Sequence, residues 1–63
     1  MIEPTQGLRN EGAKVLLPYL QKATEENPND ADTHYSLGDA YSELGRWQEA
    51  IESFKQAIRI KPD

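Results

Sequence analysis

The sequence predicts an all-α fold of three antiparallel helices. Three segments of the 63-residue chain carry apolar residues at steps of three and four, which is the spacing of one helix face. Two short segments rich in Asn, Asp, Pro and Gly separate them, and these residue types favour turns. No segment alternates apolar and polar residues over the length of a strand, so we expect no sheet.

The first helix is expected over residues 8–26, and residues 1–7 are expected to be disordered because chain ends fray unless they are tied down. Its predicted packing stripe consists of Leu8, Val15, Leu16, Tyr19, Leu20 and Ala23. Pro18 lacks the N–H of a helical hydrogen bond, so we expect either a kink or a later helix start. Pro28 disfavours helical backbone in the residue before it and ends the helix.

The second helix is expected over residues 31–44. Asn29 or Asp30 is placed to cap its first N–H groups, because a short polar side chain just before a helix accepts from them. The predicted apolar stripe of this helix consists of Thr33, Leu37, Ala40, Tyr41 and Leu44. Gly45 follows in the position where a helix end requires left-handed backbone.

The third helix is expected over residues 47–60. One face carries Trp47, Ala50, Ile51, Phe54, Ala57 and Ile58. Glu49 near its start and Arg59 near its end suit the helix dipole, and Pro62 prevents continuation. Because only two residues separate this helix from the second, the two must run antiparallel and in contact.

Composition limits the classes of function. Eleven acidic against seven basic residues give a net charge of −4, and the basic residues do not cluster, so we expect no nucleic acid partner. The longest apolar run is far shorter than a membrane span requires, and no secretory signal opens the sequence. With no cysteine and one histidine, neither a metal nor a cofactor is expected. These features together favour a cytoplasmic protein.

Residues 31–63 resemble the tetratricopeptide repeat, whose pattern is W-x2-L-G-x2-Y, then A-x3-F, then P. The matching residues are Leu37, Gly38, Tyr41, Ala50, Phe54 and Pro62. His34 stands where the family favours tryptophan. Independently of the family, Gly38 and Ala57 are small where two helices would cross closely, and large neighbours fill the space beside them.

The resemblance extends toward the N-terminus. Pro28 lies 34 residues before Pro62, which is the length of one repeat. At the same offset Leu16, Leu20 and Ala23 correspond to Ala50, Phe54 and Ala57. The first helix therefore resembles the second helix of a preceding repeat. The expected architecture is an α-solenoid fragment of about one and a half repeats.

The resemblance implies a non-enzymatic function in binding a protein or peptide. The face that lines the ligand groove in this family corresponds here to Asp32, Tyr35, Asp39, Ser42 and Glu43. This set contains three acids and no cation, which favours a neutral or basic ligand; a plain polar surface is the alternative. His34 has no nucleophile or paired carboxylate at helical spacing. The paired acids, Glu25 with Glu26 and Glu49 with Glu52, have no predicted cleft between them. We therefore expect no enzyme.

A second surface is expected on the third helix. Its apolar residues Trp47, Ile51, Ile58 and Ile60 are candidates for self-association, because a domain of this size rarely supplies enough core by itself. A homodimer is the simplest closed assembly. The alternative is that the chain is a structural piece of a longer array, with no separate activity.

Overall fold

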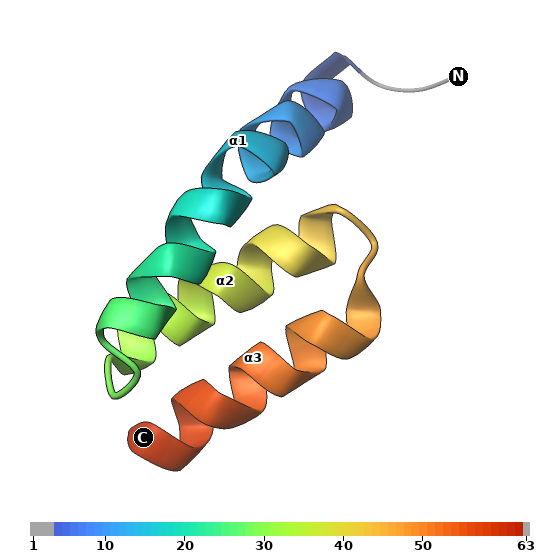
Figure 1. The fold of residues 1–63 in the computed structure, drawn as a ribbon. Helices are drawn as coiled ribbons and strands as arrows, with labels where there is room; N and C mark the ends of the chain where they lie inside the picture. The colour runs from blue at the N-terminus through green and yellow to red at the C-terminus, as the bar shows by residue number, and fades with distance from the viewer. Residues whose placement is uncertain (1–3, 63) are drawn as a thin grey trace.

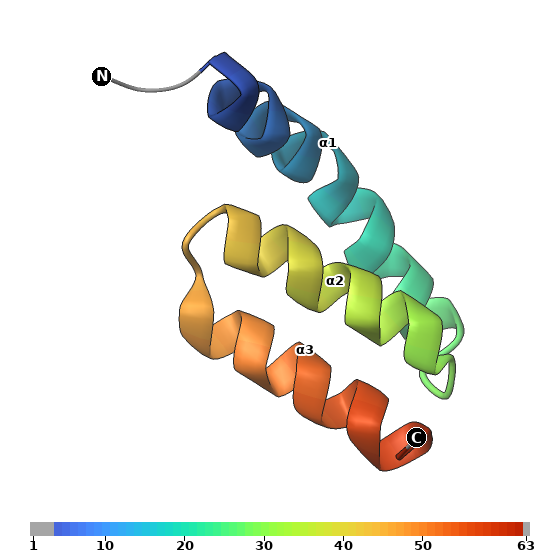
Figure 2. The same ribbon diagram turned by 180° about the vertical axis from the view of Figure 1, so that it is seen from behind.

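A computed structural model describes residues 4–62 of the chain, and side chains from residue 11 to residue 62. It consists of helices α1 (Pro4–Glu26), α2 (Ala31–Glu43) and α3 (Trp47–Ile60), with no strand in the described part. The all-α prediction is confirmed. Figures 1 and 2 show α2 in the middle, with α1 on one side and α3 on the other. Among the described residues α1 and α3 do not touch, so α2 carries both helix–helix interfaces.

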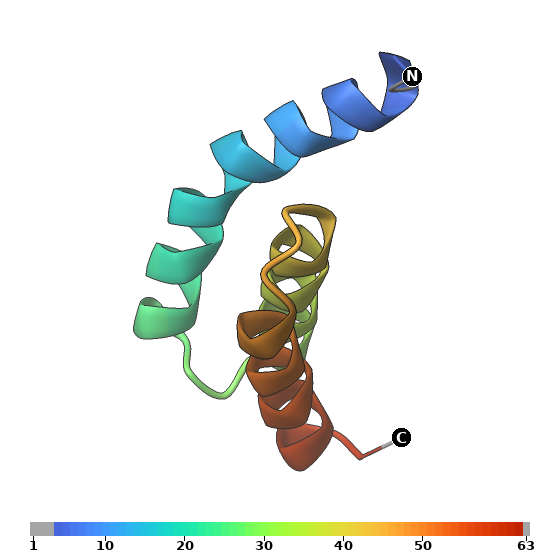
Figure 3. The ribbon, with the colours of Figure 1, turned by 90° about the vertical axis from the view of Figure 1, so that its right-hand side faces the viewer.

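Helix α1 begins at Pro4, four residues before the predicted start at Leu8. Proline suits the first helical position because its ring fixes a helical φ and its missing N–H would have no partner there. Residues 1–3 of the segment expected to be disordered lie outside the described residues. The helix runs through Pro18, so the later start expected as one possibility is wrong. Figure 3 shows α1 curving between its blue and green ends, as the other expectation, a kinked helix, requires.

The turn between α1 and α2 is closed by side-chain and backbone hydrogen bonds. Asp30 is the N-cap of α2, and its carboxylate accepts from the backbone N–H of Asp32 at 3.1 Å. A ring nitrogen of His34 lies 2.8 Å from the carbonyl oxygen of Pro28. Both contacts hold the turn against the first turns of α2.

The turn between α2 and α3 is a Schellman motif. Gly45 has φ of +77°, its N–H donates to the carbonyl of Ser42 at 3.1 Å, and the N–H of Arg46 donates to that of Tyr41 at 2.9 Å. Helix α2 ends at Glu43, one residue earlier than predicted, because Leu44 serves as the C-cap. The glycine prediction for this turn is confirmed.

The core follows the two interfaces of α2. Its buried members are Ala13, Leu17, Leu37, Ala40, Tyr41 and Ala50, with Leu20, Leu44 and Phe54 partly buried against them. The prediction that α2 needs a small residue at Gly38 is confirmed, since a Cβ added there would lie 2.6 Å from Cε1 of Phe54. The Phe54 ring of α3 therefore packs directly on α2 at Gly38.

The predicted packing stripe of α1 was wrong in part. Val15, Leu16 and Tyr19 are exposed, whereas Ala13 and Leu17 are buried. Val15, Leu16 and Tyr19 thus form an exposed apolar stripe on α1, and Ala13 and Leu17 form a second one that α2 covers. At the 34-residue offset the exposed stripe corresponds to the face by which α3 contacts α2. No described helix packs on this stripe in α1.

Candidate protein-binding surfaces

The five residues predicted to face a ligand lie along one side of α2, which we call the α2 face: Asp32, Tyr35, Asp39, Ser42 and Glu43. All are exposed except Ser42, which is half-buried because its hydroxyl turns back and donates to the carbonyl of Asp39 at 2.9 Å. The Tyr35 ring meets Phe54 edge-on, with 5.2 Å between ring centroids. This contact fixes the only aromatic member of the face.

The residues of the α2 face border two separate shallow hollows. Asp39 and Glu43 border one of about 440 Å³ beside α1, where Leu16 and Leu20 supply apolar surface. A second hollow, of about 350 Å³, lies toward the end of α3 and is lined by Ala31, Asp32, Tyr35, Ala57, Ile58, Lys61 and Pro62. The first hollow therefore combines acidic and apolar surface, whereas the second has the basic Lys61 as well as Asp32. The structure does not bring all five residues into one pocket.

Three large apolar side chains are exposed on α3, and we call them the α3 stripe. Trp47 is 64% exposed, Ile51 52% and Ile58 60%. Their spacing of four and seven places them on one side of the helix. Ile60, predicted with them, is half-buried and borders a separate hollow with Asn29 and Asp30. The structure thus groups three of the four predicted residues.

A charged cluster at the start of α3 was not foreseen. The Arg46 guanidinium donates to both carboxylate oxygens of Glu49, at 2.7 and 2.6 Å, and lies 5.0 Å from the centre of the Tyr41 ring. The hydrogen bond to Glu49 raises the pKa of Arg46 above its ordinary value. The i, i+3 spacing is the sequence signal for this pair. The Arg46–Glu49 pair joins the turn to the first turn of α3.

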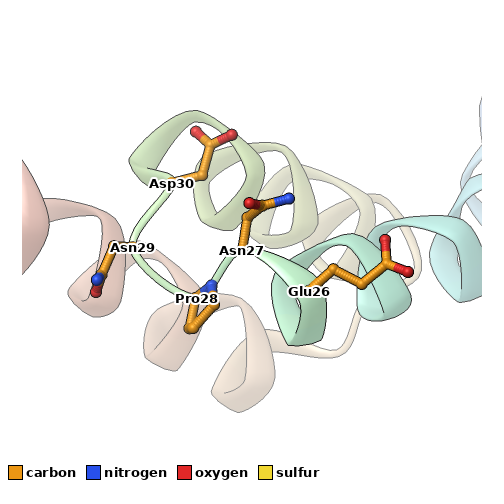
Figure 4. Close-up of a pocket in the computed structure, with 5 residues that line it drawn as sticks. All are labelled: Glu26, Asn27, Pro28, Asn29 and Asp30. Carbon is orange, nitrogen blue, oxygen red and sulfur yellow. The ribbon is translucent and has the colours of Figure 1, made fainter.

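A further hollow lies at the first turn. It is lined by Glu26, Asn27, Pro28, Asn29 and Asp30. Figure 4 shows the side chains of Glu26 and Asn29 pointing away from each other, so they do not converge on a ligand. Among the side chains described, those of residues 11–62, no three of His, Asp or Glu are close enough to hold a metal ion.

None of the helices in the described part of the chain is long and apolar enough to cross a membrane.

The three helices are joined by short turns and stack side by side, with α2 packed between α1 and α3. This arrangement defines a helical-repeat protein of the α-solenoid class. The family model for the tetratricopeptide repeat matches residues 31–63, which cover α2, the Schellman turn and α3. The chain therefore belongs to the tetratricopeptide repeat family.

Similarity to known proteins extends beyond these residues. The chain is 35% identical to Superkiller protein 3 of Saccharomyces cerevisiae over 46 residues, which is 73% of this chain and 3% of that protein. It is 34% identical to cellulose synthase operon protein C of Escherichia coli K12 over 50 residues, covering 79% of this chain and 4% of that protein. The chain thus spans a few per cent of the length of these relatives. No solved structure is significantly similar to it.

Proposed function

We propose that this chain is a protein-binding module that associates with a second copy of itself through the α3 stripe. Tetratricopeptide repeats bind proteins or peptides in general, and the observation that carries the finer proposal is the exposure of Trp47, Ile51 and Ile58 side by side. Exposed apolar surface of this kind costs free energy in water and marks interaction sites. A homodimer is the smallest assembly that would cover it.

Sedimentation velocity over a hundredfold range of protein concentration tests the association. The wild-type chain is expected to gain mass as concentration rises, and Ile51→Glu to remain monomeric because a buried carboxylate opposes the contact. Gln48→Glu is the matched control, since it adds the same charge at an exposed position of α3. A wild-type monomer at every concentration would instead support the alternative that the α3 stripe is covered by a further repeat in a longer array.

A second proposal concerns the α2 face, where acidic side chains border apolar hollows. Asp39 lies beside Leu16 and Leu20, and Asp32 lies beside Tyr35 and Ile58. A ligand suited to the hollow at Asp39 is a peptide with apolar anchors and either no charge or Lys and Arg.

Titration of fluorescent peptide libraries tests the charge preference. Neutral and Lys-containing or Arg-containing peptides are expected to bind, and the binding of basic peptides should weaken with salt because exposed charge pairs are screened. Asp39→Asn should lower affinity for basic peptides, whereas Glu52→Gln, which removes an exposed acid from α3, should not. Selection of acidic peptides only, unaffected by Asp39→Asn, would contradict this assignment.

A further inference from the structure

The internal repeat allows the surfaces of α1 and α3 to be compared position by position. At the offset of 34 residues the α3 stripe corresponds to Ala13, Leu17 and Thr24 of α1. Ala13 and Leu17 are buried, in one cluster with Leu37 and Ala40 of α2. The exposed stripe of α3 is therefore the counterpart of the surface by which α1 packs on α2.

At two of these positions α3 has the larger apolar side chain. Trp47 stands for Ala13 and Ile58 for Thr24, whereas Ile51 and Leu17 are isomers of equal size. Since the gain from burial grows with the apolar area removed from water, the α3 stripe offers an α2 helix more apolar surface than the matching residues of α1 do.

The polar part of the α1 contact also has an equivalent in α3. The amide nitrogen of Gln21 donates to the Tyr41 hydroxyl at 3.1 Å, and Lys55 occupies the matching position of α3. Its ammonium group is likewise a donor. If α3 docked on an α2 helix in the orientation of α1, Lys55 would take the place of Gln21 as a donor to the Tyr41 hydroxyl of that α2.

We propose that the α3 stripe of one chain docks on the Leu37–Ala40 side of α2 in a second chain and displaces the second chain's α1. This inference rests on the self-association proposed above and names the two surfaces that meet. The α1–α2 turn, with Asn27 to Asp30 all exposed, serves as the hinge. The first product is a linear homodimer, because only one chain needs to release α1, and further chains add through the same contact as a head-to-tail stack.

Competition from the chain's own α1 makes the association depend on concentration. A tethered helix acts at an effective concentration of about millimolar when its linker is short. Helix α1 thus limits stacking in dilute solution and caps the first chain of each stack.

Hydrogen exchange with mass spectrometry on the wild-type chain, at rising protein concentration, tests displacement directly. As mass increases, amides of residues 4–26 are expected to lose protection while those of residues 47–60 keep or gain it. If mass rises and α1 stays protected, the chains associate by another contact and this inference is wrong. If mass does not rise at any concentration, both the association and the displacement are wrong.

A pair of variants in α1 gives a second test. Leu17→Ala removes a buried contact of α1, and Val15→Ala shortens a side chain of the same helix that is 71% exposed. Leu17→Ala is expected to lower the concentration at half-association by about tenfold or more, because it weakens the competitor. Val15→Ala should leave it unchanged. Equal or weaker association of a folded Leu17→Ala chain, relative to Val15→Ala, would overturn the proposal.

Discussion

At the scale of single residues, Gly38 makes room for the Phe54 ring between α2 and α3. The Phe54 ring occupies the space where a Cβ of residue 38 would lie. The family pattern and the physical argument from small residues both predicted this approach. The half-burial of Phe54 could not be predicted, because it depends on how far Tyr35 covers the ring.

Gly38→Ala is therefore expected to destabilise the fold, although alanine is the better helix former. A carbon 2.6 Å from Phe54 Cε1 forces the ring or the helix to move, and overpacking of this kind costs about 1–3 kcal/mol. Gly12→Ala is the control, because nothing lies within 4 Å of a Cβ there, and it should stabilise by about 0.5–1 kcal/mol. Urea unfolding measures both variants, and two changes of the same sign would contradict the close approach.

At the scale of elements, the ends of α2 were more predictable than the buried face of α1. Asp30 fixes the start of α2 by capping it, and Gly45 fixes its end by adopting a positive φ. Both residue types are visible in the sequence. The buried face of α1 was not predictable in this way, since both of its stripes have helical spacing. Only the arrangement of the helices decides that Leu17 is buried and Tyr19 exposed.

The same distinction explains the candidate binding residues. The positions on α2 could be predicted because a single helix determines which side chains share a side. Their division between two hollows depends on α1 and α3, which border the α2 face at opposite ends. Ile60 was grouped with Ile58 by composition, but two residues along a helix turn the side chain by about 200°.

Removal of the N-cap of α2 tests the account of that helix start. Asp30→Ala should cost about 0.5–2 kcal/mol of stability, because the N–H of Asp32 loses its acceptor. Asn29→Ala changes an exposed neighbour in the same turn and should have a smaller effect. Thermal unfolding followed by circular dichroism compares them, and an equal loss from Asn29→Ala would assign the cap to the wrong residue.

At the scale of the whole molecule, both helix–helix interfaces lie on α2. The core is therefore two layers of contacts on either side of one helix. Among the described residues α1 and α3 do not meet, so the outer side of each is open to a partner. The 34-residue offset in the sequence predicted this stacked order, and the apolar residues of the third helix predicted three members of the α3 stripe. The competition between α1 and α3 for equivalent surfaces emerged only when burial showed which side of α1 packs on α2.

Trp47 provides the most direct test of protein contact through the α3 stripe. It is the only tryptophan of the chain, and 64% of it is exposed, so its fluorescence reports on this surface alone. Acrylamide quenching of Trp47 is expected to fall as protein concentration rises from micromolar toward millimolar, because a second chain covers the ring. Quenching that stays equally efficient over this range would contradict the account.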